Sequence, residues 1–258
     1  MPGAVAAPVL RRPSSRRAVL RSLAGLACAG TAGAAAYRHL PWRAWQADLS
    51  TATGTQRHIV LQDGSNLYLG AQSAVNLQFD ASRRQLALVA GEILVATHAD
   101  RDFAPARPFT VRTPHGTVRA LGTRFTVRLD AGRTRVQVLE DAVEIRPAQA
   151  SGRALRLHSG QQASFDALAV GARRPVPPGA DAWTGMRLSV LHMPLQDVLA
   201  ELARYRPGHL DCDPAVAQLQ VSGVFPLDDT DAALATLAGS FPLRIQRATR
   251  YWIRVVPR

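Results

Sequence analysis

A cluster of residue types that bind metals lies at positions 209–213, where His209, Asp211, Cys212 and Asp213 follow closely on one another. Imidazole, carboxylate and thiolate groups are ligands for transition metals, but short polar clusters of this kind more often cap a turn. The seven histidines of the chain show no paired spacing of the His-x-x-x-His type. We therefore predict no metal site and no cofactor.

Signatures of catalysis are also missing from the sequence. It contains no Gly-x-Ser-x-Gly nucleophile elbow and no phosphate-binding loop. A β-rich enzyme acting on carbohydrate would need two paired carboxylates, and no such pair is suggested by the few acidic residues of the β-rich region. We expect no enzymatic activity.

The charge of the chain is strongly positive, but it is unevenly spread. The 258 residues include 31 basic and 19 acidic ones, and every basic residue is an arginine. Seven arginines precede residue 44, so the rest of the chain has a net charge of only +5. A nucleic-acid binder concentrates its positive charge on a folded domain. A helix-turn-helix reading of residues 194–218 also fails because its second element is too short. We expect no nucleic-acid partner.

The early arginines flank an apolar segment, residues 18–37, which follows a short basic tail, residues 1–17. Its uncharged part, residues 22–37, would span about 24 Å as a helix, less than the roughly 30 Å of the bilayer core. Residues 18–20 lengthen the span if the side chain of Arg21 reaches the lipid headgroups. Arginines before the segment predict a cytoplasmic N-terminus and an exported body. The residues that we assign to this membrane segment are Val19, Leu20, Leu23, Leu26, Cys28 and Tyr37.

The same segment also fits a cleaved export signal. It has a basic start, a moderately apolar middle and the small residues of positions 34–36 as a cleavage site. Arginines 16 and 17 also resemble a twin-arginine motif. We favour a retained single-pass anchor in a bacterial inner membrane, with the body in the periplasm. The alternative is a soluble, exported, β-rich envelope-binding or scaffold protein released by cleavage.

The body of the chain, residues 45–168, shows short runs that alternate between apolar and polar residues, such as VNLQF at 75–79 and RVQVL at 135–139. Turn residues separate the runs, as in Asp63-Gly64. This pattern predicts an all-β domain, a sandwich or a solenoid-like fold. Prolines and glycines in residues 169–183 predict a linker.

The C-terminal region, residues 184–258, has a different pattern. Apolar residues at 195, 198, 199 and 202 predict a helix that begins at Pro194, and residues 219–225 read as a strand. Asp228, Asp229 and Thr230 are candidates to cap a second helix, and two further runs suggest a closing hairpin. We predict a small α+β domain, so the chain as a whole is mainly β.

An ordered set of short motifs resembles the FecR family of membrane-bound regulators. The most distinctive is VRALGTRFTVR at 118–128, and a helix segment, LAELARY at 199–205, also matches. We interpret the glycines as turn or close-contact positions and Phe125, with its alternating neighbours, as core. The residues that carry the family signature are Asp63, Gly64, Gly91, Glu92, Gly122, Thr123, Phe125, Leu139, Glu140, Gly160 and Gln161.

The resemblance implies a signal transducer. It would sense ferric-siderophore occupancy of a TonB-dependent outer-membrane receptor, bind that receptor's periplasmic signalling domain and regulate an extracytoplasmic-function sigma factor. The resemblance also implies that the C-terminal domain is similar to the short N-terminal module of secretins and TonB-dependent receptors. Strand addition is a plausible docking mode, and our candidate partner-binding residues are Val221, Ser222, Gly223, Val224 and Phe225.

One feature departs from the family. Its members carry a cytoplasmic anti-sigma domain before the membrane span, whereas only 17 residues precede the apolar segment here. Either the start is incorrectly placed or the gene is split, which we favour, or the chain is a variant that has lost this domain. A sigma factor is therefore expected as a partner only if an upstream cytoplasmic domain exists.

Overall fold

The computed structural model describes residues 46–150, 152 and 154–258. The predicted basic tail and membrane segment lie outside these residues. Within the described part of the chain, no helix has both the length and the apolar character needed to cross a membrane.

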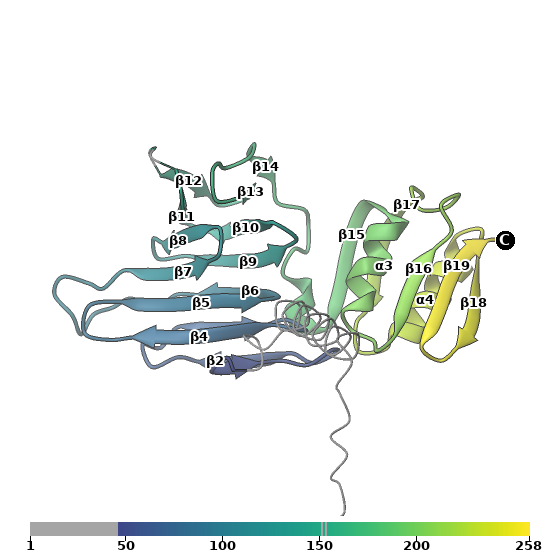
Figure 1. Ribbon diagram of the computed structural model, residues 1–258, viewed down its shortest axis with the longest axis horizontal. Coiled ribbons are helices and arrows are strands. Elements are labelled where there is room, and N and C mark those ends of the chain that lie inside the picture. Colours follow the sequence, from purple (N-terminus) through teal and green to yellow (C-terminus); the bar gives the residue numbers. More distant parts are fainter. Residues whose placement is uncertain (1–45, 151, 153) are drawn as a thin grey trace, which may run out of the picture. The chain divides into compact units, whose positions relative to one another are not determined.

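Two seven-stranded sheets share one core and form a β sandwich (Figure 1). The first sheet runs in the order β1 (Leu49–Ser50), β4 (Ala74–Phe79), β5 (Arg84–Ala90), β7 (Phe109–Thr113), β8 (Gly116–Ala120), β11 (Ala142–Pro147) and β12 (Leu155–His158). The second sheet runs in the order β14 (Arg174–Pro175), β13 (Gln161–Phe165), β10 (Arg133–Glu140), β9 (Arg124–Asp130), β6 (Glu92–Ala96), β3 (Asn66–Leu69) and β2 (Arg57–Val60).

The chain builds both sheets together. After β1 it adds strands to one sheet and then to the other, and each new strand lies next to the previously placed strand of its own sheet. All pairs are antiparallel except β5 with β7, which is parallel. The sandwich thus grows along one direction in the manner of a solenoid, so it combines the two predicted arrangements.

Alternating side chains fill the space between the sheets. Phe125 and Val127 of β9 are fully buried, and Leu129 packs against the same core. Their strand neighbours on β9, such as Thr126 and Arg128, point to the outer face of the second sheet, because successive residues of a strand face opposite sides. The prediction of a mainly β chain is confirmed.

The C-terminal module contains two strand–helix–strand units. The first is β15 (Arg187–Pro194), α3 (Leu195–Ala203) and β16 (His209–Cys212), and the second is β17 (Gln220–Pro226), α4 (Thr230–Ser240) and β18 (Leu243–Thr249), followed by β19 (Trp252–Pro257). β15 pairs with β17, while β18 and β16 flank β19. The buried faces of both helices form one core with both sheets.

Several boundaries differ from the sequence-based expectation. Pro194 is the N-cap of α3 and not its first residue, and the helix ends at Ala203. Residues 214–218, the second element of the rejected helix-turn-helix reading, contain no helix, as expected. Part of the predicted linker is ordered secondary structure, because β14 pairs with β13 and a 3-10 helix, η1 (Ala182–Gly185), buries Trp183.

Candidate functional site

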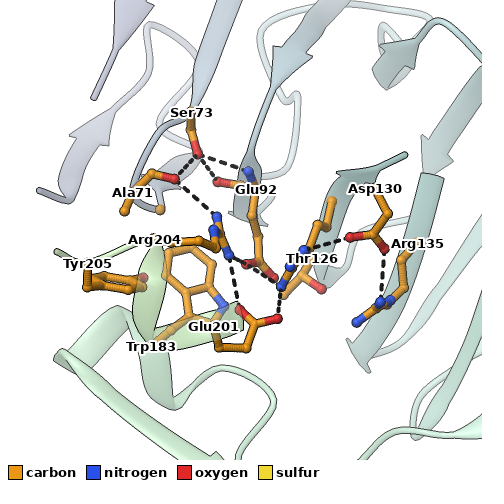
Figure 2. Close-up of polar contacts among 12 residues, drawn as sticks. Ala71, Ser73, Glu92, Thr126, Asp130, Arg135, Trp183, Glu201, Arg204 and Tyr205 are labelled. Carbon is orange, nitrogen blue, oxygen red and sulfur yellow. Dashed lines mark hydrogen bonds and ion pairs between the residues drawn. The ribbon is translucent and has the colours of Figure 1, made fainter. Parts of the chain in front are cut away.

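Four charged side chains meet where helix α3 lies against the outer face of the second sheet, and we call this group the charged junction. Glu92 comes from β6, Arg128 from β9, and Glu201 and Arg204 from α3 and its C-cap. Their side chains are only 10%, 19%, 19% and 13% exposed, respectively. Figure 2 labels Glu92, Glu201 and Arg204 of this group, which joins the sandwich to the C-terminal module.

The distances define two bridges across the junction. Arg204 Nη1 lies 2.9 Å from Glu92 Oε2 and 3.4 Å from Glu201 Oε2. Arg128 Nη1 lies 2.5 Å from Glu201 Oε1 and 3.8 Å from Glu92 Oε2. Each carboxylate therefore faces two guanidinium groups, and the four charges sum to zero.

Burial shifts the protonation of this group. Desolvation raises the pKa of Glu92 above its ordinary value of 4.5, although Arg128 and Arg204 oppose the shift. Desolvation lowers the pKa of Arg128, but the carboxylates of Glu201, Glu92 and Asp130 outweigh it, so the net direction is upward. A buried carboxylate held in this way depends on its partners, because an unpaired buried charge is costly.

The backbone around Glu92 is fixed by a tight turn. Gly91 has a φ of +78°, and a Cβ at this position would lie 2.6 Å from the carbonyl oxygen of Gln72. Ser73 Oγ accepts a hydrogen bond from the Glu92 N–H at 2.9 Å and donates one to the Glu92 carbonyl at 2.9 Å. Only glycine fits at position 91 without strain, so the Gly-Glu pair places the carboxylate at the junction.

A loop near the start of the described chain also reaches the junction. The Gly54 N–H donates to the carbonyl of Arg204 at 3.1 Å. Gln56 Nε2 donates to the Tyr205 hydroxyl at 3.1 Å and to the carbonyl of Trp183. The first residues of the sandwich are thus hydrogen-bonded to the C-terminal end of α3.

Apolar side chains close the remaining contact. Leu94 and Ala71 of the sandwich belong to the core of the C-terminal module. Trp183 is 8% exposed, and its indole N–H has no hydrogen-bond partner among the described residues. A cavity of about 100 Å³ lies beside it and is lined by both sides of the junction.

The other signature residues lie elsewhere and stabilise the fold. Asp63 accepts hydrogen bonds from Ser65 and forms a buried ion pair with Arg84 at 2.8 Å. Gly64 and Gly122 have positive φ values of 80° and 84°. The remaining positions are a buried Thr123, a fully buried Phe125, a half-buried Leu139 against the module's core, an exposed Glu140, and Gly160 and Gln161 at the turn into β13.

The candidate partner-binding strand is only partly accessible. Val221 and Phe225 are buried in the module's core, whereas Ser222, Gly223 and Val224 are exposed. Among the described residues, β17 pairs with β15 alone. One edge of β17 therefore has no strand partner in this part of the chain.

The residues at 209–213 do not converge on one point. His209 Nε2 lies 3.4 Å from Asp211 Oδ2, and both side chains are largely exposed. Cys212 follows them on the opposite face of β16. The part of the chain that the structure describes contains no group of three or more potential metal ligands.

The sequence analysis assigned Gly91 and Glu92 to the family signature, but it did not identify the residues that pair with Glu92. Arg128 and Arg204 lie within the quoted family motifs, yet nothing in those motifs indicates that they meet. The only available signal was the presence of arginine at an outward-facing position of β9 and at the end of an amphipathic helix.

Comparison with known proteins agrees with this architecture. Residues 47–144 match the family described as FecR protein. Two crystal structures from Parabacteroides distasonis, at 2.50 and 1.65 Å resolution and each described as a "putative anti-sigma factor", have a similar fold. Each is 21% identical and aligns over 81% of this chain; 98% and 96% of the other chain are covered, with TM-scores of 0.66 and 0.65. No curated protein matches significantly.

Proposed function

We propose that this chain is the signal-receiving part of a sigma-factor regulator, because residues 47–144 match the FecR family. This family is regulatory and non-enzymatic. In this proposal the chain is anchored in a bacterial inner membrane. Its periplasmic body receives a signal from a TonB-dependent outer-membrane receptor occupied by a ferric siderophore. The sigma factor is of the extracytoplasmic-function class and is reached through a cytoplasmic domain.

The charged junction is the observation that carries this proposal. A transducer must pass a change in its receiving domain to the part of the chain nearest the membrane. Here α3 of the C-terminal module is bound both to the sandwich, through Glu92 and Arg128, and to the loop that holds Gly54. That loop follows β1, the first described strand, so a shift of α3 acts directly on the N-terminal side of the sandwich.

The C-terminal module is our candidate receptor-binding domain. The resemblance to the FecR family implies that this module is similar to the short module of secretins and TonB-dependent receptors, and its small α+β fold with two strand–helix–strand units supports this assignment. The free edge of β17 and the exposed side chain of Val224, which is 59% exposed, offer a place for an added strand. Main-chain hydrogen bonds would supply the affinity at such an edge.

A binding experiment tests the receptor contact. The signalling domain of a TonB-dependent receptor from the same organism is immobilised, and the purified chain is titrated over it. We expect Val224→Arg to weaken binding at least on the order of tenfold, since a charge would be buried at the docking edge. Val60→Arg is the matched control, because Val60 is 63% exposed on β2 of the sandwich. Equal binding by both variants would exclude β17 as the docking strand.

A reporter experiment tests the regulatory role. Expression from the promoter of the matching sigma factor is measured in iron-limited cells with and without the siderophore. We expect Arg204→Met to change the siderophore response when the variant and the wild type are compared at matched abundance of the chain. An unchanged response in a strain lacking the whole chain would refute the proposed function.

A further inference from the structure

The outer face of the second sheet is only partly covered by the C-terminal module. Near β6 it is covered, because Leu94 belongs to the module's core. Over β10, β13 and β14 the same face borders a hollow of about 490 Å³, which we call the arginine groove. Residues 169–172 and Pro177 form its wall.

Hydrogen-bonded side chains form the floor of the groove. Strand register places Arg174, Gln162 and Gln137 in one row across β14, β13 and β10. Gln137 Nε2 donates to Gln162 Oε1 at 3.1 Å, and Gln162 Nε2 donates to the carbonyl of Pro175 at 2.8 Å. Thr126 holds the other end of the row by donating to Gln137 Oε1 at 3.1 Å. The two glutamine side chains are therefore fixed in position.

A second row positions one arginine. Arg135 lies opposite Ser164, and its Nη2 is 2.9 Å from Asp130 Oδ2. The other oxygen of Asp130 lies 2.9 Å from Nε of Arg128. Asp130 thus pairs both with Arg135 of the groove and with Arg128 of the charged junction. It orients Arg135, and its negative charge is balanced by these two arginines.

The remaining arginines supply positive charge that no close ion pair among the described residues neutralises. Arg133 and Arg174 stand on opposite sides of β13, and neither has a carboxylate within ion-pairing distance in the described part of the chain. They are two strands apart, and Arg133 lies four residues along β10 from Gln137, the residue in the same row as Arg174, so their Cα atoms are about 17 Å apart. Asp166, the single carboxylate of the lining, accepts hydrogen bonds from the N–H groups of Leu168 and Ala169. These bonds and the charge of Arg133 lower its pKa, so Asp166 offsets part of the positive charge at that end of the groove.

We propose that the arginine groove binds an oxyanion ligand, with carboxylate or phosphate groups held by Arg174 at one end and by Arg133 at the other. A guanidinium group matches the geometry of either oxyanion and donates two parallel hydrogen bonds to it. The volume lies within the range of small-ligand sites. The fixed amide floor and the oriented Arg135 reduce the ordering cost of binding. This site does not depend on the proposed signalling role.

Calorimetric titration of the full-length chain tests the proposal, with inorganic phosphate, glutarate and a triglutamate peptide as separate probes. We expect at least one probe to bind, and Arg174→Met to weaken its binding by about tenfold or more, since a charge-assisted hydrogen bond is lost. The control is Arg173→Met, which removes the same charge from the neighbouring exposed residue outside the groove.

The three probes distinguish the source of the oxyanion. Selective binding of phosphate identifies a phosphate ligand, and selective binding of glutarate or the peptide identifies a carboxylate ligand. The proposal is overturned if no probe binds at about 10 mM. It is also overturned if the Arg173 and Arg174 variants weaken binding equally, because that result would reflect general charge screening.

Discussion

Replacing Arg204 by methionine tests whether the charged junction holds the C-terminal module against the sandwich. Methionine keeps an unbranched apolar stem but removes the guanidinium group. The change breaks the 2.9 Å contact with Glu92, the 3.4 Å contact with Glu201 and the 3.1 Å hydrogen bond to the carbonyl of Ala71. It leaves the 10% exposed carboxylate of Glu92 with only the more distant Arg128.

The expected cost follows from this burial. Breaking a buried ion pair costs about 3–5 kcal/mol, because the remaining charge stays desolvated. Since these side chains are slightly exposed, we expect the lower end, about 3 kcal/mol. For a unit of this size, that corresponds to a fall in melting temperature of about 6–12 °C. Thermal unfolding followed by tryptophan fluorescence measures the shift, and Trp183 is buried beside the altered residue.

Arg156→Met is the matched control. Arg156 Nη2 lies 2.8 Å from Glu144, but these side chains are 53% and 26% exposed, so we expect a loss of at most about 1 kcal/mol. A double variant, Glu92→Gln with Arg204→Met, should lose at least about 1 kcal/mol less than the sum of the single losses. A similar shift for the two arginine variants, or strict additivity, would refute the coupling of module and sandwich through this pair.

Three further predictions concern single side chains. Glu92→Gln should alter the pH dependence of stability. The pKa of Glu92 is raised in the folded state, so the folded protein binds this proton more tightly than the unfolded chain does. The stability of the wild type should therefore fall relative to that of the variant as the pH rises from about 4.5 through the folded-state pKa of Glu92. Urea unfolding of both proteins across this pH range measures the difference, and parallel curves would contradict it. Gly91→Ala should cost at least about 2 kcal/mol in the same assay, because strain at positive φ adds to the clash with the carbonyl of Gln72. Gly132→Ala is the control and should cost about 1 kcal/mol, because Gly132 also has a positive φ but faces open space. Asp229→Ala should cost about 1 kcal/mol, since the Asp229 carboxylate caps α4 through a 2.9 Å hydrogen bond; no change in unfolding free energy would show that the cap is dispensable.

Alternation along the chain was sufficient to predict a mainly β body and the inward direction of Phe125. The choice between sandwich and solenoid stayed open because both have the same period of two, and only the order of strand pairing separates them. The N-cap of α4 was narrowed to residues 228–230, because cap chemistry is local, and the structure selects Asp229 among them. Pro194 was misplaced by one position, since proline is common both before and at the first turn of a helix.

The site was harder to predict than the fold. Glu92 and Gly91 were assigned to the signature, but Arg204 lies 112 positions further along the chain. Which outward-facing charges meet depends on how α3 docks on the sheet, and no local pattern encodes that geometry. The arginine groove was missed for a similar reason, because Arg133 and Arg174 face one hollow only through the register of β10, β13 and β14.

The alternating construction of the two sheets has an evolutionary consequence. Each hairpin contacts mainly the hairpins placed just before and after it, so a sandwich of this kind can lengthen or shorten by whole hairpins without rewiring its remaining strands. Relatives could therefore differ in the number of hairpins beyond β9 and still keep Glu92 and Arg128 side by side on β6 and β9. Duplication of hairpins would diversify the outer surface of the sandwich and leave its attachment to α3 unchanged.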